Sequence, residues 1–196
     1  SEVGVRTIPP YLGNPAIYIE GDRCTVRGLG RVYMHGYGVW IGGNDNRVVG
    51  CTITGPLYAG VRINGPFNGP PATGNVIGGT APGDGNVLSS GNSGVRIDGP
   101  AEDNVVIGNT LSGSFYGVEV RTPYCCAGNE ARNNRIGGPT VAERNVINGA
   151  GKYGEEGFPV GGMVYVEYST GTVIEGNYLG VNADGVSVPS SQRGPV

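Results

Sequence analysis

A short motif recurs along the chain, and one position in it carries side chains that suit the binding of sugars and anions. The motif is a small residue followed by apolar residues at alternate positions, with copies starting at Ala16, Gly38, Gly60, Gly94, Gly117 and, with Met in the first place, Met163. Alternate residues of a strand point to opposite faces, so the residue between the two apolar ones points outward. In chain order this residue is Tyr18, Trp40, Arg62, Arg96, Glu119 and Tyr165. Aromatic planes beside guanidinium and carboxylate groups suit sugar rings and acidic polysaccharides, so we predict that these six residues form a ligand-binding face.

A second outward position adds charge to this face and leaves a plainer interpretation open. In chain order it holds Glu20, Gly42, Asn64, Asp98, Arg121 and Glu167. Arg62 beside Arg96 is unfavourable unless an anionic ligand or a nearby acid offsets the repulsion. Alternatively, pairs such as Arg96 with Glu119 and Asp98 with Arg121 would make the face a set of surface ladders, each contributing roughly 0–1 kcal/mol.

The candidates for catalysis are Asp98, Glu119 and Arg96. Asp98 and Glu119 are diagonal neighbours, which in a sheet lie about 7–8 Å apart. Inverting glycosidases separate their two carboxyl groups by roughly 6.5–9.5 Å, so the spacing permits that reaction. Arg96 and Arg121 would hold both acids ionised, however, whereas a general acid needs a raised pKa. For a lyase, Arg62 or Arg96 is the candidate base, although no metal-binding motif accompanies them.

The sequence predicts no metal site and no cofactor. His35 is the only histidine and no C-x-x-C pair exists, which argues against zinc. Calcium is the one ion with a candidate loop, NADG from Asn182. This segment lacks the remaining ligands of a calcium loop, so we interpret it as a turn.

The four cysteines fall into two pairs with different settings. Cys24 and Cys51 occupy different columns of the repeat described below, so a disulfide between them is not favoured, and each is interpreted as a small buried residue. Cys125 and Cys126 are adjacent in an inserted loop, where a vicinal disulfide and a free pair both remain open.

The elements that must position these residues are strands joined by turns. Glycine accounts for 39 of 196 residues, against an ordinary share of about 7%, and 14 prolines accompany it. No eleven-residue window free of Gly and Pro shows the apolar stripe of a helix. Successive copies of the motif start 22, 22, 34, 23 and 46 residues apart, which indicates a repeat of about 22 residues with insertions in the third and fifth units.

A second motif follows these strands and consists of two short strands separated by a glycine. Its copies are CTVRGL from Cys24, NRVVGCTI from Asn46, NVVIGNTL from Asn104 and TVIEGNYL from Thr172. Stacking the copies gives one column of Cys24, Asn46, Asn104 and Thr172 and another of Leu29, Cys51, Asn109 and Asn177. Asn tolerates left-handed corners and its amide can bond along a stack, so the pattern predicts a β-solenoid with equivalent residues about 4.8 Å apart.

Three segments carry a family resemblance. They are NVIGGTAPGDGNVLSSGN from Asn75, NRIGGPTVAERNVINGA from Asn134 and VIEGNYLGVNADG from Val173. They resemble the right-handed parallel β-helix repeats of large bacterial surface and secreted proteins, over residues 16–185. The resemblance implies an all-β, single-stranded right-handed parallel β-helix of about six coils. The wider pectate-lyase-like superfamily includes lyases, glycoside hydrolases, epimerases, adhesins and phage tailspikes, so the resemblance does not decide the activity.

The chain departs from the enzymes of that superfamily. The N-T-D, D-D, G-H-G and R-I-K motifs of its polygalacturonase-type hydrolases are absent, and the nearest match to G-H-G is MHG around His35. Pectate lyases need an acidic calcium cluster beside a basic catalyst, whereas the acidic residues of this chain are dispersed in sequence.

Charge and hydropathy exclude two classes of partner. The formal net charge is −3, and the basic residues are scattered, which argues against nucleic acid. No run approaches 18 apolar residues, so no membrane span is predicted. The N-terminal segment does not look like a signal peptide, and a mature secreted chain would look the same. Together with the resemblance, these features indicate a secreted or cell-surface protein.

The predicted domain plan is an extended segment over 1–15 followed by a β-helix over 16–196. The last residues, GPV from Gly194, look like the start of another strand, so we expect no cap there. Either the solenoid continues in a longer protein or copies stack end to end. We therefore expect a structural, adhesive or fibre-forming role with a polysaccharide-binding face. The alternative is a polysaccharide lyase or glycoside hydrolase.

Overall fold

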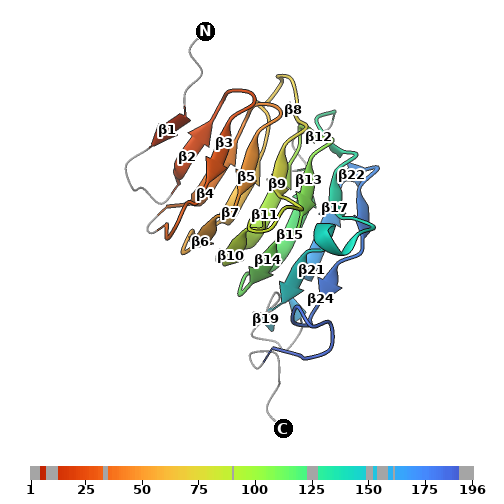
Figure 1. Cartoon of the computed structure of the whole chain (residues 1–196). Helices are drawn as coiled ribbons and strands as arrows, with labels where there is room; N and C mark the ends of the chain where they lie inside the picture. The colour runs from red at the N-terminus through yellow and green to blue at the C-terminus, as the bar shows by residue number, and fades with distance from the viewer. Residues whose placement is uncertain are drawn as a thin grey trace.

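The chain folds as an all-β protein, as the sequence predicts (Figure 1). The computed structural model describes residues 5–7, 13–32, 35–89, 91–122, 128–148, 152–153, 159–160 and 162–189. Within these ranges the only helical element is the 3-10 turn η2, Val141–Glu143. No helix in the described ranges is long and apolar enough to cross a membrane.

The strands formed by the six copies of the first motif lie side by side in one sheet, called sheet A. Its order is β1 (Val5–Thr7), β2 (Pro15–Ile19), β4 (Tyr37–Ile41), β7 (Ala59–Ile63), β11 (Ser93–Asp98), β15 (Tyr116–Arg121) and β21 (Gly162–Glu167). All neighbours from β2 to β21 are parallel, and only β1 pairs antiparallel, along β2.

Three further parallel sheets take the shorter strands. Sheet B holds β3 (Thr25–Arg27), β5 (Arg47–Val49), β9 (Val76–Gly78), β13 (Val105–Ile107), β17 (Arg135–Gly137) and β23 (Val173–Glu175). Sheet C holds β6 (Thr52–Thr54), β10 (Val87–Ser89), β14 (Thr110–Ser112), β18 (Val146–Asn148) and β24 (Tyr178–Leu179). Sheet D holds β8 (Ala72–Thr73), β12 (Ala101–Glu102), β16 (Ala131–Arg132) and β22 (Ser169–Thr170).

The chain visits the sheets in a fixed order and returns to sheet A one strand further along. The fourth repeat, for example, supplies β11 to sheet A, β12 to sheet D, β13 to sheet B and β14 to sheet C. We call the strands of one repeat a rung and number the rungs 1 to 6 by their strands β2, β4, β7, β11, β15 and β21. Strands β19 (Lys152–Tyr153) and β20 (Pro159–Val160) form a separate antiparallel pair. This repeat-like stacking of parallel strands is compatible with a β-solenoid.

The apolar residues of the motifs fill the space between the sheets in layers. Rungs 1 to 5 each contribute aliphatic side chains that are completely buried, such as Ile63, Ile97 and Val120 in sheet A. Stacking like side chains on like removes apolar area from water at every rung, which is the main stabilising contribution to such a fold.

The small residue at the start of each copy also points into this core. A Cβ added to Gly38 would lie 2.6 Å from Cγ2 of Ile53, and one added to Gly94 would lie 2.6 Å from Cδ2 of Leu111. Two adjacent residues therefore face inward near the start of β4, β7, β11 and β15. The first must be small because a core side chain of sheet C lies against it.

Two ladders of asparagine bind the rungs together at the corners that flank sheet B. In each ladder the side-chain oxygen of one Asn accepts a hydrogen bond from the backbone N–H of the equivalent residue one rung earlier, over distances of 2.8–3.3 Å. The first ladder is Cys24, Asn46, Asn75, Asn104 and Asn134, and the second is Cys51, Asn86, Asn109, Asn145 and Asn177. The predicted columns are thus extended by Asn75, Asn86, Asn134 and Asn145, which the sequence alignment left out.

The ladders explain the glycines of the N-x-I-G-G segments. Gly78 and Gly137 have φ of +90° and +84°, and a Cβ on Gly78 would collide with the carbonyl of Ile107 and the amide of Asn109.

Cys24 and Cys51 are free thiols, and burial raises the pKa of Cys51. Cys125 and Cys126 lie outside the described residues.

Candidate ligand-binding face

The six residues predicted for the ligand-binding face lie in one row across the outer side of sheet A. The strand register pairs Tyr18 with Trp40, Trp40 with Arg62 and Arg62 with Arg96. It then pairs Arg96 with Glu119 and Glu119 with Tyr165. The insertions in the third and fifth repeats therefore leave the register of the strands intact.

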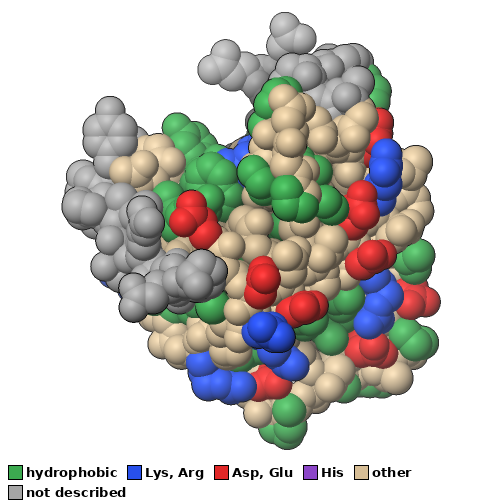
Figure 2. Space-filling model, turned by 90° about the horizontal axis from the view of Figure 1, so that it is seen from above, with side chains coloured by type: hydrophobic (Ala, Val, Ile, Leu, Met, Phe, Trp, Pro, Cys, Tyr) green, Lys and Arg blue, Asp and Glu red, His purple; other side chains and the backbone are tan. Residues whose placement is uncertain are grey.

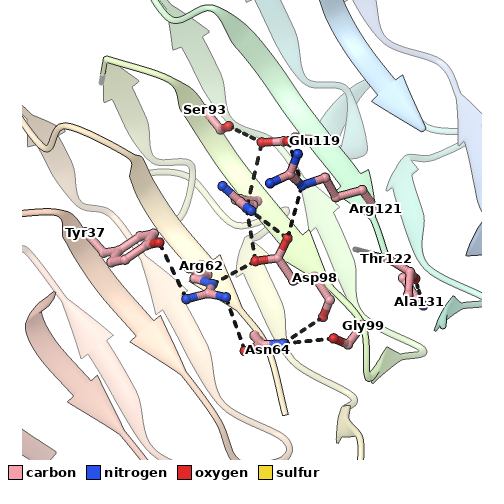
Figure 3. Close-up of polar contacts among 11 residues, drawn as sticks. Tyr37, Arg62, Asn64, Ser93, Asp98, Gly99, Glu119, Arg121, Thr122 and Ala131 are labelled. Atoms are coloured by element: carbon pink, nitrogen blue, oxygen red, sulfur yellow. Dashed lines mark hydrogen bonds and ion pairs between the residues drawn. The ribbon is translucent and has the colours of Figure 1, made fainter. Parts of the chain in front are cut away.

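Three further residues on the same face were missed by the sequence analysis: Tyr37, Ser93 and Tyr116. Each occupies the first strand position, directly before the small residue of the motif. Strict alternation would place them inward, but the small residue and the next one both face the core, which turns the preceding side chain outward. The contacts of Tyr37 and Ser93 with the row are drawn in Figure 3.

An aromatic cluster covers the face at rungs 1 to 3. The ring of Trp40 lies 5.5 Å from that of Tyr18 and 5.4 Å from that of Tyr37, and Tyr37 lies 5.5 Å from Tyr58. The guanidinium of Arg62 stands over this cluster, 4.2 Å from the centre of Trp40 and 5.1 Å from that of Tyr37. Cation–π contacts of this kind hold an arginine in one orientation.

The two carboxylates of the face are buried, which corrects the interpretation of the charges as exposed surface ladders. The side chains of Asp98 and Glu119 are each only 1% exposed. Asp98 accepts hydrogen bonds from Nε of Arg62 and Nε of Arg96, both at 2.8 Å, as Figure 3 shows for Arg62. The acid that offsets the repulsion between Arg62 and Arg96 is therefore part of the protein.

Glu119 is held in a similar way one strand further along. Its carboxylate accepts a hydrogen bond from the hydroxyl of Ser93 at 2.5 Å and lies 3.1 Å from Nε of Arg121 (Figure 3). Arg121 also lies 3.7 Å from Asp98, and Arg96 lies 3.9 Å from Glu119, so the predicted pairs form one network. Burial lowers the pKa of Arg96. The negative charge of Asp98 and its hydrogen bonds with Arg96 outweigh burial, so the pKa of Arg96 is raised overall.

A second group of aromatic rings covers the face at rungs 5 and 6. The rings of Tyr116 and Tyr165 lie 5.0 Å apart at an angle of 30°, and Phe115 packs edge-on against Tyr116 at 4.9 Å. Burial and the nearby charge of Glu119 raise the pKa of Tyr116, and a hydrogen bond with Glu167 raises that of Tyr165. Both phenols therefore stay neutral at physiological pH and present uncharged rings.

The arrangement does not favour Asp98 or Glu119 as a general acid. A proton donor needs to reach its substrate and to hold a proton near neutral pH. Both carboxylates are buried beneath arginines, out of reach of a substrate. Arg96, the third catalytic candidate, is only 12% exposed and its Nε is bound to Asp98.

The remaining candidates for metal or cofactor binding lie apart from the face. Among the described residues, no three His, Cys, Asp or Glu side chains are grouped as metal ligands. The carboxylate of Asp184 in the NADG segment accepts hydrogen bonds from the N–H groups of Val186 and Ser187 and from the Ser187 hydroxyl. These bonds close a turn, as the sequence analysis interpreted this segment.

Charges of both signs are interspersed on the face that Figure 2 views, with no broad patch of one sign. Asp84, for example, lies 3.1 Å from Arg27 and 3.9 Å from Arg47.

Comparison of the chain with models of known families, with curated proteins and with solved structures finds no match.

Proposed function

We propose that the chain is a right-handed parallel β-helix of six rungs that works outside the cell as a structural or adhesive scaffold and binds polysaccharide on the outer face of sheet A. The stacked parallel sheets and the unbroken register of the repeats support the β-helix. The resemblance of the N-x-I-G-G segments to repeats of bacterial surface proteins of the pectate-lyase-like superfamily supports the location.

The observation that carries the binding proposal is the order of side chains across sheet A. Two aromatic groups, around Trp40 and around Tyr165, flank a central network of arginines on one continuous face. The six parallel strands stack at about 4.8 Å, so the face extends for roughly 24 Å along the direction of stacking. A face of this length, with rings at both ends, suits an extended chain of sugars better than a small molecule.

A polysaccharide-degrading enzyme is the alternative, and the chemistry of the face favours it less. Asp98 and Glu119 are buried and paired, so neither is placed to donate a proton to a glycosidic oxygen. For a lyase, all three nitrogens of Arg62 already have hydrogen-bond acceptors, which leaves Arg96 as the remaining candidate base.

The test is a titration with glycans that uses the fluorescence of Trp40, the only tryptophan in the chain. We expect at least one extended plant or bacterial polysaccharide to change the emission saturably, and Tyr165→Ala to weaken its binding roughly fivefold. Val141→Ala, at an exposed site in η2, is the control and should bind as the unchanged chain does. No binding to any glycan would reject the proposal. If absorbance near 235 nm rises on uronate polymers, or if reducing sugar is released, the chain is an enzyme and the scaffold proposal is wrong.

We further propose that copies of the chain associate through the end formed by rung 6. Residues of rung 6 that correspond to fully buried positions of rung 5 are exposed: Ile174 by 46% and Leu179 by 47%, against 0% for Ile136 and Ile147. At the other end of sheet A, β1 already covers β2 as an antiparallel strand. A second copy placed with its rung 6 against this one, and its own β21 added antiparallel to β21, would repeat this mode of pairing and would cover Ile174 and Leu179 in sheets B and C.

A further inference from the structure

The three arginines of the face differ in how their nitrogens are used. Arg62 is fully engaged: its Nε donates to Asp98 at 2.8 Å, its Nη1 to the hydroxyl of Tyr37 at 3.5 Å and its Nη2 to the side chain of Asn64 at 3.3 Å. Its guanidinium also stacks on Trp40. Arg62 therefore orders the aromatic cluster, and each of its three nitrogens already donates to a side chain of the protein.

Arg96 and Arg121 are engaged only through Nε. Nε of Arg96 donates to both oxygens of Asp98, and Nε of Arg121 lies 3.1 Å from Glu119. Within the described part of the chain, the terminal nitrogens Nη1 and Nη2 of both residues have no hydrogen-bond acceptor. These four nitrogens are open to solvent, because none of them is both buried and without a partner. The Arg121 side chain is 35% exposed.

The buried carboxylates hold these two arginines side by side. Asp98 lies within 4 Å of Nε of both, as does Glu119. At this inner edge Arg96 is hydrogen-bonded and Arg121 is ion-paired without a hydrogen bond, and the outer edge of each guanidinium is left free. The five charged side chains Arg62, Arg96, Arg121, Asp98 and Glu119 carry one net positive charge. Glu167 lies next to Arg121 in the register, but it is hydrogen-bonded with Tyr165 and makes no ion pair with Arg121 within 4 Å.

We infer that the outer edges of Arg96 and Arg121 together bind an oxyanion carried by the polysaccharide, a carboxylate or a sulfate group. Guanidinium groups match such planar or tetrahedral oxyanions with two parallel N–H donors each. Tyr116 lies on β15, the strand of Arg121, and Tyr165 lies on the next strand, β21, where the sugar ring that bears the anion can rest on the two rings. The inference depends on the proposed function, because it names the class of glycan that this face selects: acidic polysaccharides.

The experiment compares matched glycans that differ in charge alone. Polygalacturonate is titrated beside its fully methyl-esterified form, and dextran sulfate beside dextran. We expect each acidic polymer to bind at least tenfold more tightly than its neutral partner, and this difference to shrink as NaCl rises. The polygalacturonate pair reports carboxylate recognition and the dextran pair reports sulfate recognition.

Substitutions then locate the anion. We expect Arg121→Gln to weaken binding of the preferred acidic polymer about tenfold and to leave that of the neutral polymer nearly unchanged. Arg121→Lys should restore part of the loss because it keeps the charge without the paired donors. The control is Arg132→Gln, which removes a half-exposed arginine paired with Glu102 and Glu130 on sheet D. Thermal unfolding confirms that each variant is folded.

The outcomes separate this inference from the proposed function. If the acidic and neutral polymers bind equally well, or if folded Arg121→Gln binds the acidic polymer unchanged, the face binds glycans but the oxyanion site is wrong. If no polymer binds, the proposed function fails and the oxyanion site fails with it.

Discussion

Asp98 is the residue on which the central network of the face depends. Its carboxylate is within 4 Å of three guanidinium groups, those of Arg62, Arg96 and Arg121, and it is almost completely buried. A buried charge is tolerated only when its partners and hydrogen bonds replace the water that it loses. The carboxylate therefore does two things at once: it cancels the repulsion between stacked arginines and it fixes their orientation.

Asp98→Asn should destabilise the fold strongly. The amide cannot balance three positive charges, so three guanidinium groups would face one another on adjacent strands. We expect the free energy of unfolding to fall by about 3 kcal/mol or more, measured by urea denaturation. Asp84→Asn is the matched control, because Asp84 pairs with Arg27 and Arg47, which are 62% and 50% exposed, and its loss should cost less than about 1 kcal/mol. Equal losses in the two variants would contradict this account.

At the scale of the elements, the asparagine ladders fix one rung on the next. Asn109 shows the pattern: its side-chain oxygen accepts from the backbone N–H and the amide of Asn86. Its own amide donates to the carbonyls of Ile77 and Ile107 and to the side chain of Asn145. Asn109 thus satisfies polar groups on three consecutive rungs, where buried backbone would otherwise lack partners.

Asn109→Ala should therefore cost more than the same change at the end of the ladder. The variant leaves polar groups of Asn86 and Ile77 buried without partners, so we expect the free energy of unfolding to fall by about 3 kcal/mol. Asn177→Ala removes an equivalent side chain that is only partly buried, where water can take over the lost bonds, and should cost about 1 kcal/mol. Chemical denaturation of the two variants measures the difference, and a smaller loss for Asn109→Ala would refute the role of the ladder.

The sequence could predict the register of sheet A but only part of the ladders and of the face. Copies of the strand motif align because insertions fall in the connections, so the row from Tyr18 to Tyr165 is correct. Asn75 and Asn86 were missed because the same insertions change the spacing of ladder neighbours to 29 and 35 residues. The burial of Asp98 could not be predicted from alternation, because it depends on arginine side chains that reach it from three different strands.

At the scale of the whole molecule, the two ends of the stack differ. The strand β1 pairs along β2 at the first rung, and Ile19 there is fully buried. At rung 6, Val166, Ile174 and Leu179 are 40%, 46% and 47% exposed, although their equivalents in rung 5 are completely buried. Strand edges with exposed apolar side chains tend to pair with other strands, so this end is the one expected to drive association.

Self-association through rung 6 predicts a closed dimer rather than a filament. A two-fold contact joins rung 6 of one copy to rung 6 of the other, so the same surface is used in both copies and no further copy can add through it. We expect sedimentation velocity to show a concentration-dependent equilibrium between monomer and dimer, and Leu179→Lys to shift it to monomer by placing a charge on the interface. Val87→Lys is the control, since Val87 is 44% exposed on β10 in the third rung, away from the end of the stack. A monomer at all concentrations would exclude the association, and polymers of increasing length would instead show that copies join head to tail.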